Sequence, residues 1–204
     1  NVKCKHCYNP WRDETMGDFS LDILKLKKII NKLSEHGVFH VVLSGGEPLS
    51  NYEVLREALK ILNEKNITYS CNTNLILADD QKMSELSKLG LDHCLTSIPS
   101  IDPAENDEIM QSKGSLGKIL EGIKCCIRNN IRVSANMVVT KSNKHRVYET
   151  GKLITFDSSL PHIGKGPQRR CGDIRTIIAF QAVQQDAWRY TLEEKKQKKV
   201  ESSK

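Results

Sequence analysis

Stretches with the hydrophobic period of a helix alternate with short apolar stretches typical of strands along the first 154 residues of this 204-residue chain. Residues 20–37 place apolar side chains on one face of a predicted helix, at Ile23, Leu26, Ile30 and Leu33. Ser20 stands where it can cap the start of this helix, and Gly37 where it can end it. The next residues, 38–43, form a continuous β-branched run, which is typical of a strand buried on both faces.

The same order then repeats along the chain. Further helices are expected at 52–65, 79–90, 115–130 and 143–154, and further strands at 67–74, 91–98 and 131–139. Short strands that alternate with longer helices predict βα units around a parallel sheet. Right-handed crossovers curl such a sheet toward an open or closed barrel, so the predicted class is α/β.

The alternation ends after about residue 154. Residues 155–173 are rich in Pro, Gly, Ser and charge without a clear period, which is typical of a loop or linker. Residues 174–199 favour a late helix that runs into a charged tail, and no further strand is evident. We therefore divide the chain into an α/β core of residues 1–155 and an altered or truncated segment of residues 156–204.

Composition narrows the class of protein. The net charge of +6 lies largely in the charged tail, and aromatic residues make up only 5%, which argues against a nucleic-acid-binding surface. No apolar run approaches the roughly 18 residues of a membrane-spanning helix, and the start lacks the pattern of a secretion signal. The odd count of 7 cysteines argues against a disulfide framework, so we expect reduced thiols and a cytoplasmic location.

Four stretches with polar or small residues follow the predicted strands or open the chain. In a parallel α/β sheet the loops at the carboxyl ends of the strands form the site, so these stretches are expected on one rim: residues 4–10, 44–48, 72–74 and 96–100. Gly45 and Gly46 allow a ligand to approach the backbone, because no Cβ intervenes. Glu47 adds a carboxylate suited to accept from an ammonium group, although a tight turn with a solvated Glu fits the same letters.

Cys4 and Cys7 form a C-x2-C pair in the opening stretch. Taken alone, this pair is compatible with half a zinc site, a redox dithiol or part of an iron–sulfur ligand run. A second pair at zinc-ribbon spacing is absent from the sequence, and no strand precedes the pair as a redox dithiol would require. The remaining cysteines are expected to be core residues or, for Cys171, a lone thiol.

The combination of "CKHCYNP", "LSGGEPL" and "NTN", with helices and strands between them, resembles the radical S-adenosylmethionine (SAM) superfamily. Within it, the chain looks most like the peptide- and protein-modifying branch, whose maturases often carry a cysteine-rich SPASM-type extension. The resemblance covers about residues 1–155 and implies a partial (β/α)6-type parallel barrel. The cluster motif of that family is C-x3-C-x2-C, so its first cysteine would fall one residue before Asn1.

The resemblance also implies cofactors and site residues. Cys4 and Cys7 would be ligands of a [4Fe–4S] cluster whose open iron is chelated by SAM, and the backbone of His6 would meet the adenine. The segment that receives the SAM amino group would be Ser44, Gly45, Gly46 and Glu47. Weaker candidates for contacts with the ribose or carboxylate are Asn72, Thr73, Asn74, Ser97 and Asn136, for which ordinary turn chemistry is an equal explanation.

The implied reaction is reductive cleavage of SAM to a 5′-deoxyadenosyl radical, which abstracts hydrogen from a peptide or protein substrate. An electron donor such as flavodoxin or ferredoxin is expected, and neither nucleic acid nor a membrane is expected as a partner. Two alternatives remain: an enzyme that activates a glycyl-radical partner, and an inactive or non-catalytic metal-binding remnant. Because the first cluster cysteine is not among residues 1–204, we expect this chain alone to have weak or no activity.

Overall fold

The computed structural model describes residues 1–7 and 21–156. The elements follow one another in the order α1 (Ile23–Glu35), β1 (His40–Leu43), α2 (Tyr52–Glu64), β2 (Thr68–Asn72), α3 (Asp80–Lys88), β3 (His93–Ser97), α4 (Pro103–Met110), α5 (Ser115–Arg128), β4 (Arg132–Asn136) and α6 (Val147–Phe156). Short 3-10 turns, η3 (Pro48–Asn51) and η4 (Lys144–Arg146), precede α2 and α6. The expected helix and tail of residues 174–199 lie outside the described residues.

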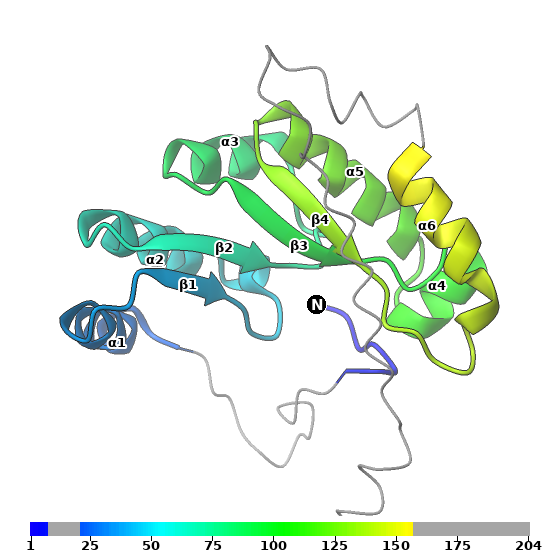
Figure 1. The fold of residues 1–204 in the computed structure, drawn as a ribbon, viewed down its shortest axis with the longest axis horizontal. Helices are drawn as coiled ribbons and strands as arrows, with labels where there is room; N and C mark the ends of the chain where they lie inside the picture. Colours follow the sequence, from blue (N-terminus) through cyan, green and yellow to red (C-terminus); the bar gives the residue numbers. More distant parts are fainter. Residues whose placement is uncertain (8–20, 157–204) are drawn as a thin grey trace, which may run out of the picture.

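The four strands form one parallel sheet in the order β1-β2-β3-β4 (Figure 1). Val41 pairs with Tyr69, Cys71 with Cys94, and Thr96 with Ala135. Neighbours in the sheet are also neighbours in the chain, so each connection is one βα unit. The predicted α/β class and its parallel sheet are confirmed.

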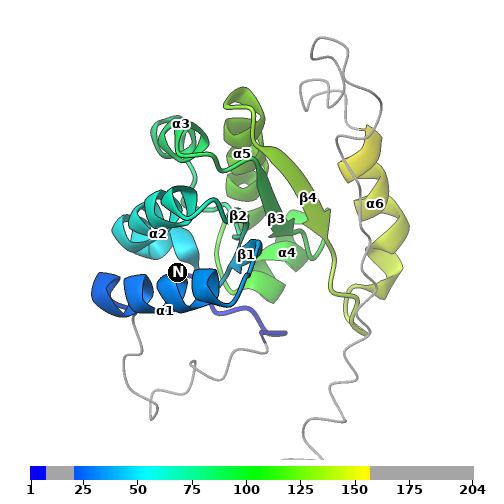
Figure 2. The ribbon, with the colours of Figure 1, turned by 60° about the vertical axis from the view of Figure 1, so that its left-hand side comes forward.

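Helices α2, α3 and α5 cover one face of the sheet and leave the opposite face uncovered (Figure 2). Tyr69, Cys71 and Cys94 point to the covered face and join its hydrophobic core. Helix residues complete this core, among them Leu59, Leu62, Met83, Leu86, Ile119 and Ile123. Because side chains alternate along a strand, Thr68, Ser70 and Asn72 point to the opposite, polar face.

Helix starts are set by short polar side chains. Asp22 accepts a hydrogen bond from Lys25 N at 2.7 Å at the start of α1, and Asp79 does the same for Lys82 N at 2.8 Å in α3. The cap of α1 is therefore Asp22 rather than the expected Ser20, which lies outside the described residues. None of the helices in the described ranges is both long and apolar enough to cross a bilayer.

Helix α4 was missed by the sequence prediction. Its buried residues are Asn106, Ile109 and Met110, so it has no broad apolar stripe. Its signal is at the start instead: Asp102 accepts from Glu105 N at 2.9 Å, and Pro103 occupies the first turn. A D-P-x-E sequence is a recognisable helix start even where hydrophobic periodicity is weak.

Candidate functional site

The loops that follow the parallel strands lie at one edge of the sheet, and the opening segment of the chain lies at the same edge (Figure 1). Residues 44–47 follow β1, and Thr73 and Asn74 follow β2. Asn1 reaches this edge directly, since its side chain and that of Asn74 exchange hydrogen bonds of 2.9 and 3.4 Å. Segments that are 73 residues apart in sequence therefore meet on one rim.

Gly45 and Gly46 form an exposed loop after β1. Within residues 1–7 and 21–156, no atom beyond the chain neighbours lies within 4 Å of a Cβ built on either glycine, so these residues leave the space in front of this backbone open. Neither has the positive φ that explains Gly37, Gly90 and Gly114. Access to the backbone, rather than turn geometry, is thus what the two glycines provide.

Glu47 directly follows the two glycines and is buried, with an exposed fraction of 7%. Its Oε1 accepts from Leu49 N at 3.0 Å and from Thr73 Oγ1 at 2.6 Å. Its Oε2 accepts from Asn74 N at 2.8 Å. The carboxylate therefore joins the loop after β1 to the loop after β2.

Cys4 and Cys7 share one turn, in which Cys7 N donates to Cys4 O at 3.1 Å. The turn is held against α4: Lys5 N donates to Ile109 O at 2.8 Å, and Lys5 Nζ lies 2.5 Å from Glu108 Oε1. Cys4 is half-buried, with Sγ 3.4 Å from Met110 Sδ, and Cys7 is exposed. His6, between them, is half-buried.

The two cysteine side chains of this turn are chemically suited to bind an iron–sulfur cluster, because thiolates are the usual protein ligands of such clusters. It supplies two thiols, one of them exposed. Within residues 1–7 and 21–156, no group of three or more His, Cys, Asp or Glu side chains is placed to hold a metal ion. The described residues thus provide two thiols in one turn, and the backbone of Gly45 and Gly46 lies on the same rim (Figure 1).

Ser97 and Asn136 end β3 and β4 as register partners, and Ser97 Oγ donates to Asn136 Oδ1 at 3.1 Å. Both are half-buried. On the same face, His93 Nε2 lies 2.9 Å from Ser134 Oγ. Burial and the nearby Arg132 lower the pKa of His93, which favours its neutral form. Asn72, the last residue of β2, points to this polar face as well.

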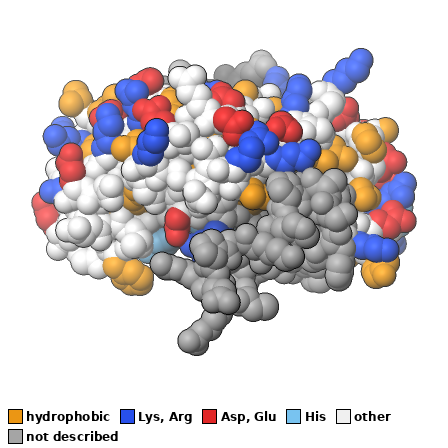
Figure 3. Space-filling model, turned by 90° about the horizontal axis from the view of Figure 1, so that it is seen from above, with side chains coloured by type: hydrophobic (Ala, Val, Ile, Leu, Met, Phe, Trp, Pro, Cys, Tyr) orange, Lys and Arg blue, Asp and Glu red, His pale blue; other side chains and the backbone are white. Residues whose placement is uncertain are grey.

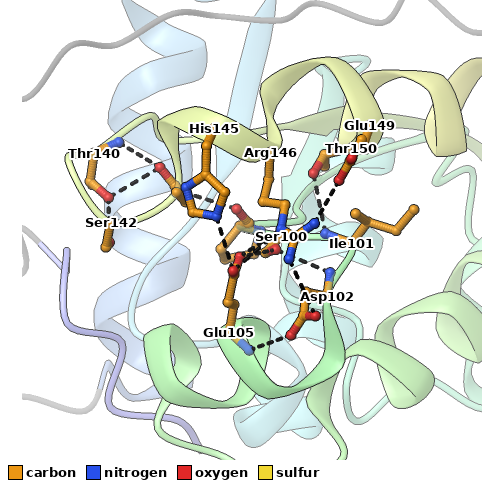
Figure 4. Close-up of polar contacts among 12 residues, drawn as sticks. Ser100, Ile101, Asp102, Glu105, Thr140, Ser142, His145, Arg146, Glu149 and Thr150 are labelled. Carbon is orange, nitrogen blue, oxygen red and sulfur yellow. Dashed lines mark hydrogen bonds and ion pairs between the residues drawn. The ribbon is translucent and has the colours of Figure 1, made fainter.

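A further polar network joins the loop after β3 to the start of α6 (Figure 4). Arg146 Nε lies 3.3 Å from both carboxylate oxygens of Glu105, and its Nη1 lies 2.8 Å from Glu149 Oε2. Ser100 Oγ donates to Glu105 Oε2 at 2.9 Å. This network fixes the loops beyond β3 and β4, and neither the hydrophobic periodicity nor the motifs predicted it.

The buried cysteines pack in the hydrophobic core on the helix-covered face of the sheet. Cys71 and Cys94 are 1% exposed and Cys126 is 0% exposed, which agrees with their expected place in the core. Burial raises the pKa of Cys71 to about 12 and raises that of Cys125. Cys71 and Cys125 are therefore protonated core residues. Cys171 lies outside the described residues.

Charged side chains of both signs are mixed on the face seen in Figure 3. Among the residues that the structure describes, several charged side chains form ion pairs, such as Arg128 Nη2 with Asp80 Oδ2 at 2.7 Å and with Glu121 Oε1 at 3.1 Å. On that face, basic residues do not gather into one patch.

Comparison with protein families identifies the class. The family model of the radical SAM superfamily matches residues 1–154 of the chain. The chain therefore belongs to the radical SAM superfamily, whose members use a [4Fe–4S] cluster and SAM. The resemblance drawn from the cysteine, glycine and asparagine motifs is confirmed.

Curated relatives in this superfamily are enzymes of several kinds. The chain is 26% identical over 148 residues to a PqqA peptide cyclase of Gluconobacter oxydans, covering 72% of this chain and 41% of the relative. It is 28% identical over 182 residues to a pre-heme d1 synthase of Dinoroseobacter shibae, covering 85% and 44%. It is 29% identical over 153 residues to a GTP 3′,8-cyclase of Clostridium perfringens, covering 73% and 46%. The chain thus spans less than half the length of these relatives.

Solved structures with the same fold include Streptococcus suis SuiB bound to S-adenosylmethionine, with a TM-score of 0.58 and 21% identity. That match covers 74% of this chain and 32% of SuiB. The structure of anSMEcpe with bound AdoMet and a peptide matches with a TM-score of 0.59 and 17% identity, covering 76% and 45%. These neighbours are barrel proteins, so the four-stranded sheet corresponds to part of the expected parallel barrel.

Proposed function

We propose that this chain is the core of a radical SAM enzyme in which Cys4 and Cys7 are two ligands of a [4Fe–4S] cluster and the loop at Gly45 and Gly46 receives the amino group of SAM. The observation that carries this proposal is the meeting of three loops on one rim, through the contacts Asn1–Asn74 and Asn74–Glu47. Parallel sheets bind ligands at this edge. Membership of the superfamily supplies the identity of the cofactors.

When bound, the cluster would supply the electron that cleaves SAM to a 5′-deoxyadenosyl radical, which abstracts hydrogen from the substrate. The residues of the chain would bind the cluster and SAM and orient them. The turn of Cys4 and Cys7 presents thiols from a backbone anchored on α4. Gly45 and Gly46 present bare backbone, whose carbonyl groups can accept from an ammonium group. Ser97, Asn136 and Asn72 would offer neutral hydrogen-bonding groups beside them.

For the substrate we propose a peptide or small protein, modified in the cytoplasm, with reduced flavodoxin or ferredoxin as the electron donor. The support comes from relatives named PqqA peptide cyclase. Other relatives are named for different substrates, such as GTP 3′,8-cyclase. GTP is therefore the alternative substrate with which a peptide should be compared. In an anaerobic assay, a peptide pool should stimulate formation of 5′-deoxyadenosine, and GTP should not. Stimulation by GTP alone would reject the peptide proposal.

The test of the cofactor proposal is anaerobic reconstitution of protein expressed from its full reading frame. We expect a brown protein with about four irons per chain, and a reduced-state EPR signal that changes when SAM is added. Cys4→Ser and Cys7→Ser should each abolish that signal, whereas Cys171→Ser should retain it. A colourless protein that binds zinc, or a signal that survives both ligand substitutions, would refute the assignment.

A further inference from the structure

Glu47 was expected to face the ammonium group of SAM, but the structure turns its carboxylate into the protein. It is 7% exposed, although Ser44, Gly45 and Gly46 just before it are exposed. It accepts three hydrogen bonds, from Leu49 N, Thr73 Oγ1 and Asn74 N, at 3.0, 2.6 and 2.8 Å. About four acceptor positions are available on a carboxylate, so the protein itself occupies most of them.

Two of the three donors come from a different βα unit. Thr73 and Asn74 belong to the loop after β2, whereas Glu47 follows β1. Thr73 is also buried, at 5% exposed, and its Oγ1 in turn accepts from Leu75 N at 3.1 Å. A buried carboxylate that accepts charge-assisted hydrogen bonds holds its donors in a narrow range of positions. The loop after β1 therefore cannot shift without breaking contacts to the loop after β2.

Asn74 extends this connection to the segment of the cysteines. Its backbone N–H donates to Glu47 Oε2, while its side-chain Nδ2 donates to Asn1 Oδ1 at 2.9 Å. Its Oδ1 also accepts from Ile76 N at 3.0 Å, which fixes the orientation of the amide. Asn1 opens the short segment that contains Cys4 and Cys7. One asparagine thus stands between the carboxylate behind the glycine loop and the cysteine turn.

We infer that Glu47 is a positioning residue: it sets the glycine loop relative to the loop after β2 and, through Asn74, relative to the cysteine turn. SAM would be bound by the backbone of Gly45 and Gly46. Glu47 would hold this backbone in position from inside the protein without contacting SAM. This inference rests on the proposed function for its consequence, but its structural part concerns only residues of this chain. The two parts can be tested separately.

The structural part is tested by amide hydrogen exchange in residues 1–204 without cofactors, read at Leu49 and Asn74, whose N–H groups donate to the Glu47 carboxylate. Thr73→Val removes the donor to Glu47 with almost no change of shape, and Thr73→Ser restores a hydroxyl. Thr150→Val is the matched control, because Thr150 is also buried and accepts one hydrogen bond, from Ile101 N at 3.2 Å, in another part of the fold. We expect Thr73→Val and Glu47→Gln to raise exchange at Leu49 and Asn74, whose N–H groups donate to Glu47, at least tenfold. Thr73→Ser and Thr150→Val should leave it near the wild-type rate.

The consequence for the cofactor is tested by the dissociation constant of SAM, and by the SAM-induced change of the EPR signal, in protein loaded with its cluster. Thr73→Val should weaken SAM binding about as much as Glu47→Gln, by tenfold or more, and Thr73→Ser should rescue it. Loss of binding in Glu47→Gln alone, with Thr73→Val unchanged, would overturn the inference and make Glu47 a direct ligand. Unchanged exchange in Thr73→Val would overturn it too. Absence of SAM binding in the wild type would refute the proposed function, and the exchange result would still decide the positioning role.

Discussion

Gly122 in α5 packs directly against Leu75, the residue that follows Asn74 on the rim. A Cβ built on Gly122 lies 2.8 Å from Leu75 Cβ and closer still to the carbonyl oxygen of Leu75. Leu75 is fully buried and has a positive φ of 59°, which is unusual for a residue with a side chain. The close approach of α5 thus supports the loop that carries Thr73 and Asn74.

Gly122→Ala should destabilise the protein, although alanine is the better helix former. The added methyl group has to displace backbone, and overpacking of this kind costs about 1–3 kcal/mol. Gly117→Ala in the same helix is the matched control, since a Cβ there meets no atom of the described part of the chain within 4 Å. The control should stabilise the protein by up to about 1 kcal/mol. Urea unfolding of both variants measures the difference, and equal effects would contradict the close packing.

Gly45→Ala and Gly46→Ala should leave the fold intact and weaken SAM binding. Both sites are exposed with open space in front of them, so the free energy of unfolding should change by less than about 0.5 kcal/mol. The new methyl group would stand where the ligand approaches the backbone, and the dissociation constant of SAM should rise at least tenfold. Equilibrium dialysis against labelled SAM measures this. An unchanged constant in both variants would place the SAM amino group elsewhere.

The sequence was sufficient for the layout of the sheet because burial on the helix side leaves a local signature. Every described strand lies within a stretch predicted as strand, yet all four are shorter than that stretch, as at His40–Leu43 in β1 and Thr68–Asn72 in β2. The predicted strand 67–74 ends early because only Thr73 N still donates to the neighbouring strand, to Leu95 O at 3.0 Å, whereas Asn74 N donates to Glu47 Oε2 instead. Local periodicity carries no information about such a contact between separate loops.

The absence of long-range information in local patterns also explains what the motifs could not predict about the site. They placed the glycine loop and the cysteine turn on one rim, but they could not foresee that Glu47 is buried, because a carboxylate after two glycines looks solvent-exposed in sequence. The pair Asn1–Asn74 and the contact of Cys4 with Met110 join residues 73 and 106 positions apart. Contacts at such separations arise from the fold, so only the assembled sheet reveals them.

Glu105→Gln should lower stability at neutral pH and have little effect in acid. Burial alone would raise the pKa of Glu105, but hydrogen bonds from Ser100, His145 and Arg146 outweigh burial and lower it. A carboxyl with a lowered pKa adds stability above its unfolded pKa of about 4.3, and that contribution is lost as the pH falls through the folded pKa. The urea midpoint of Glu105→Gln should therefore lie about 0.5 M below wild type at pH 7.

At pH 3 the two midpoints should lie closer together than at pH 7, because the stabilisation by the charged Glu105 is lost as the pH falls through its folded pKa. Glu53→Gln is the control, because Glu53 is exposed and pairs with Arg56 across one helical turn at 2.6 Å. Its effect should be small at both values of pH. A deficit of Glu105→Gln that is equal at pH 7 and pH 3 would show that its charge does not hold the network.

Alkylation should separate the rim cysteines from those behind the sheet. Cys7 is exposed, so iodoacetamide at pH 8 should modify it first. Cys71 is 1% exposed and burial raises its pKa to about 12, so its thiolate is scarce and out of reach. Reaction at Cys71, Cys94 and Cys126 then requires opening of the core and should be at least about 100-fold slower. Peptide mass spectrometry over time gives each rate.

Loading of the cluster turns the same experiment into a test of the ligands. Under anaerobic conditions a bound cluster should protect Cys4 and Cys7, because a thiolate that ligates iron is not available to the reagent, and the slow rates at Cys71 and Cys94 should stay as they were. Protection should disappear when the cluster is removed by a chelator and an oxidant. If Cys7 reacts equally fast with and without the cluster, it is not a ligand, and the role given to the opening turn fails.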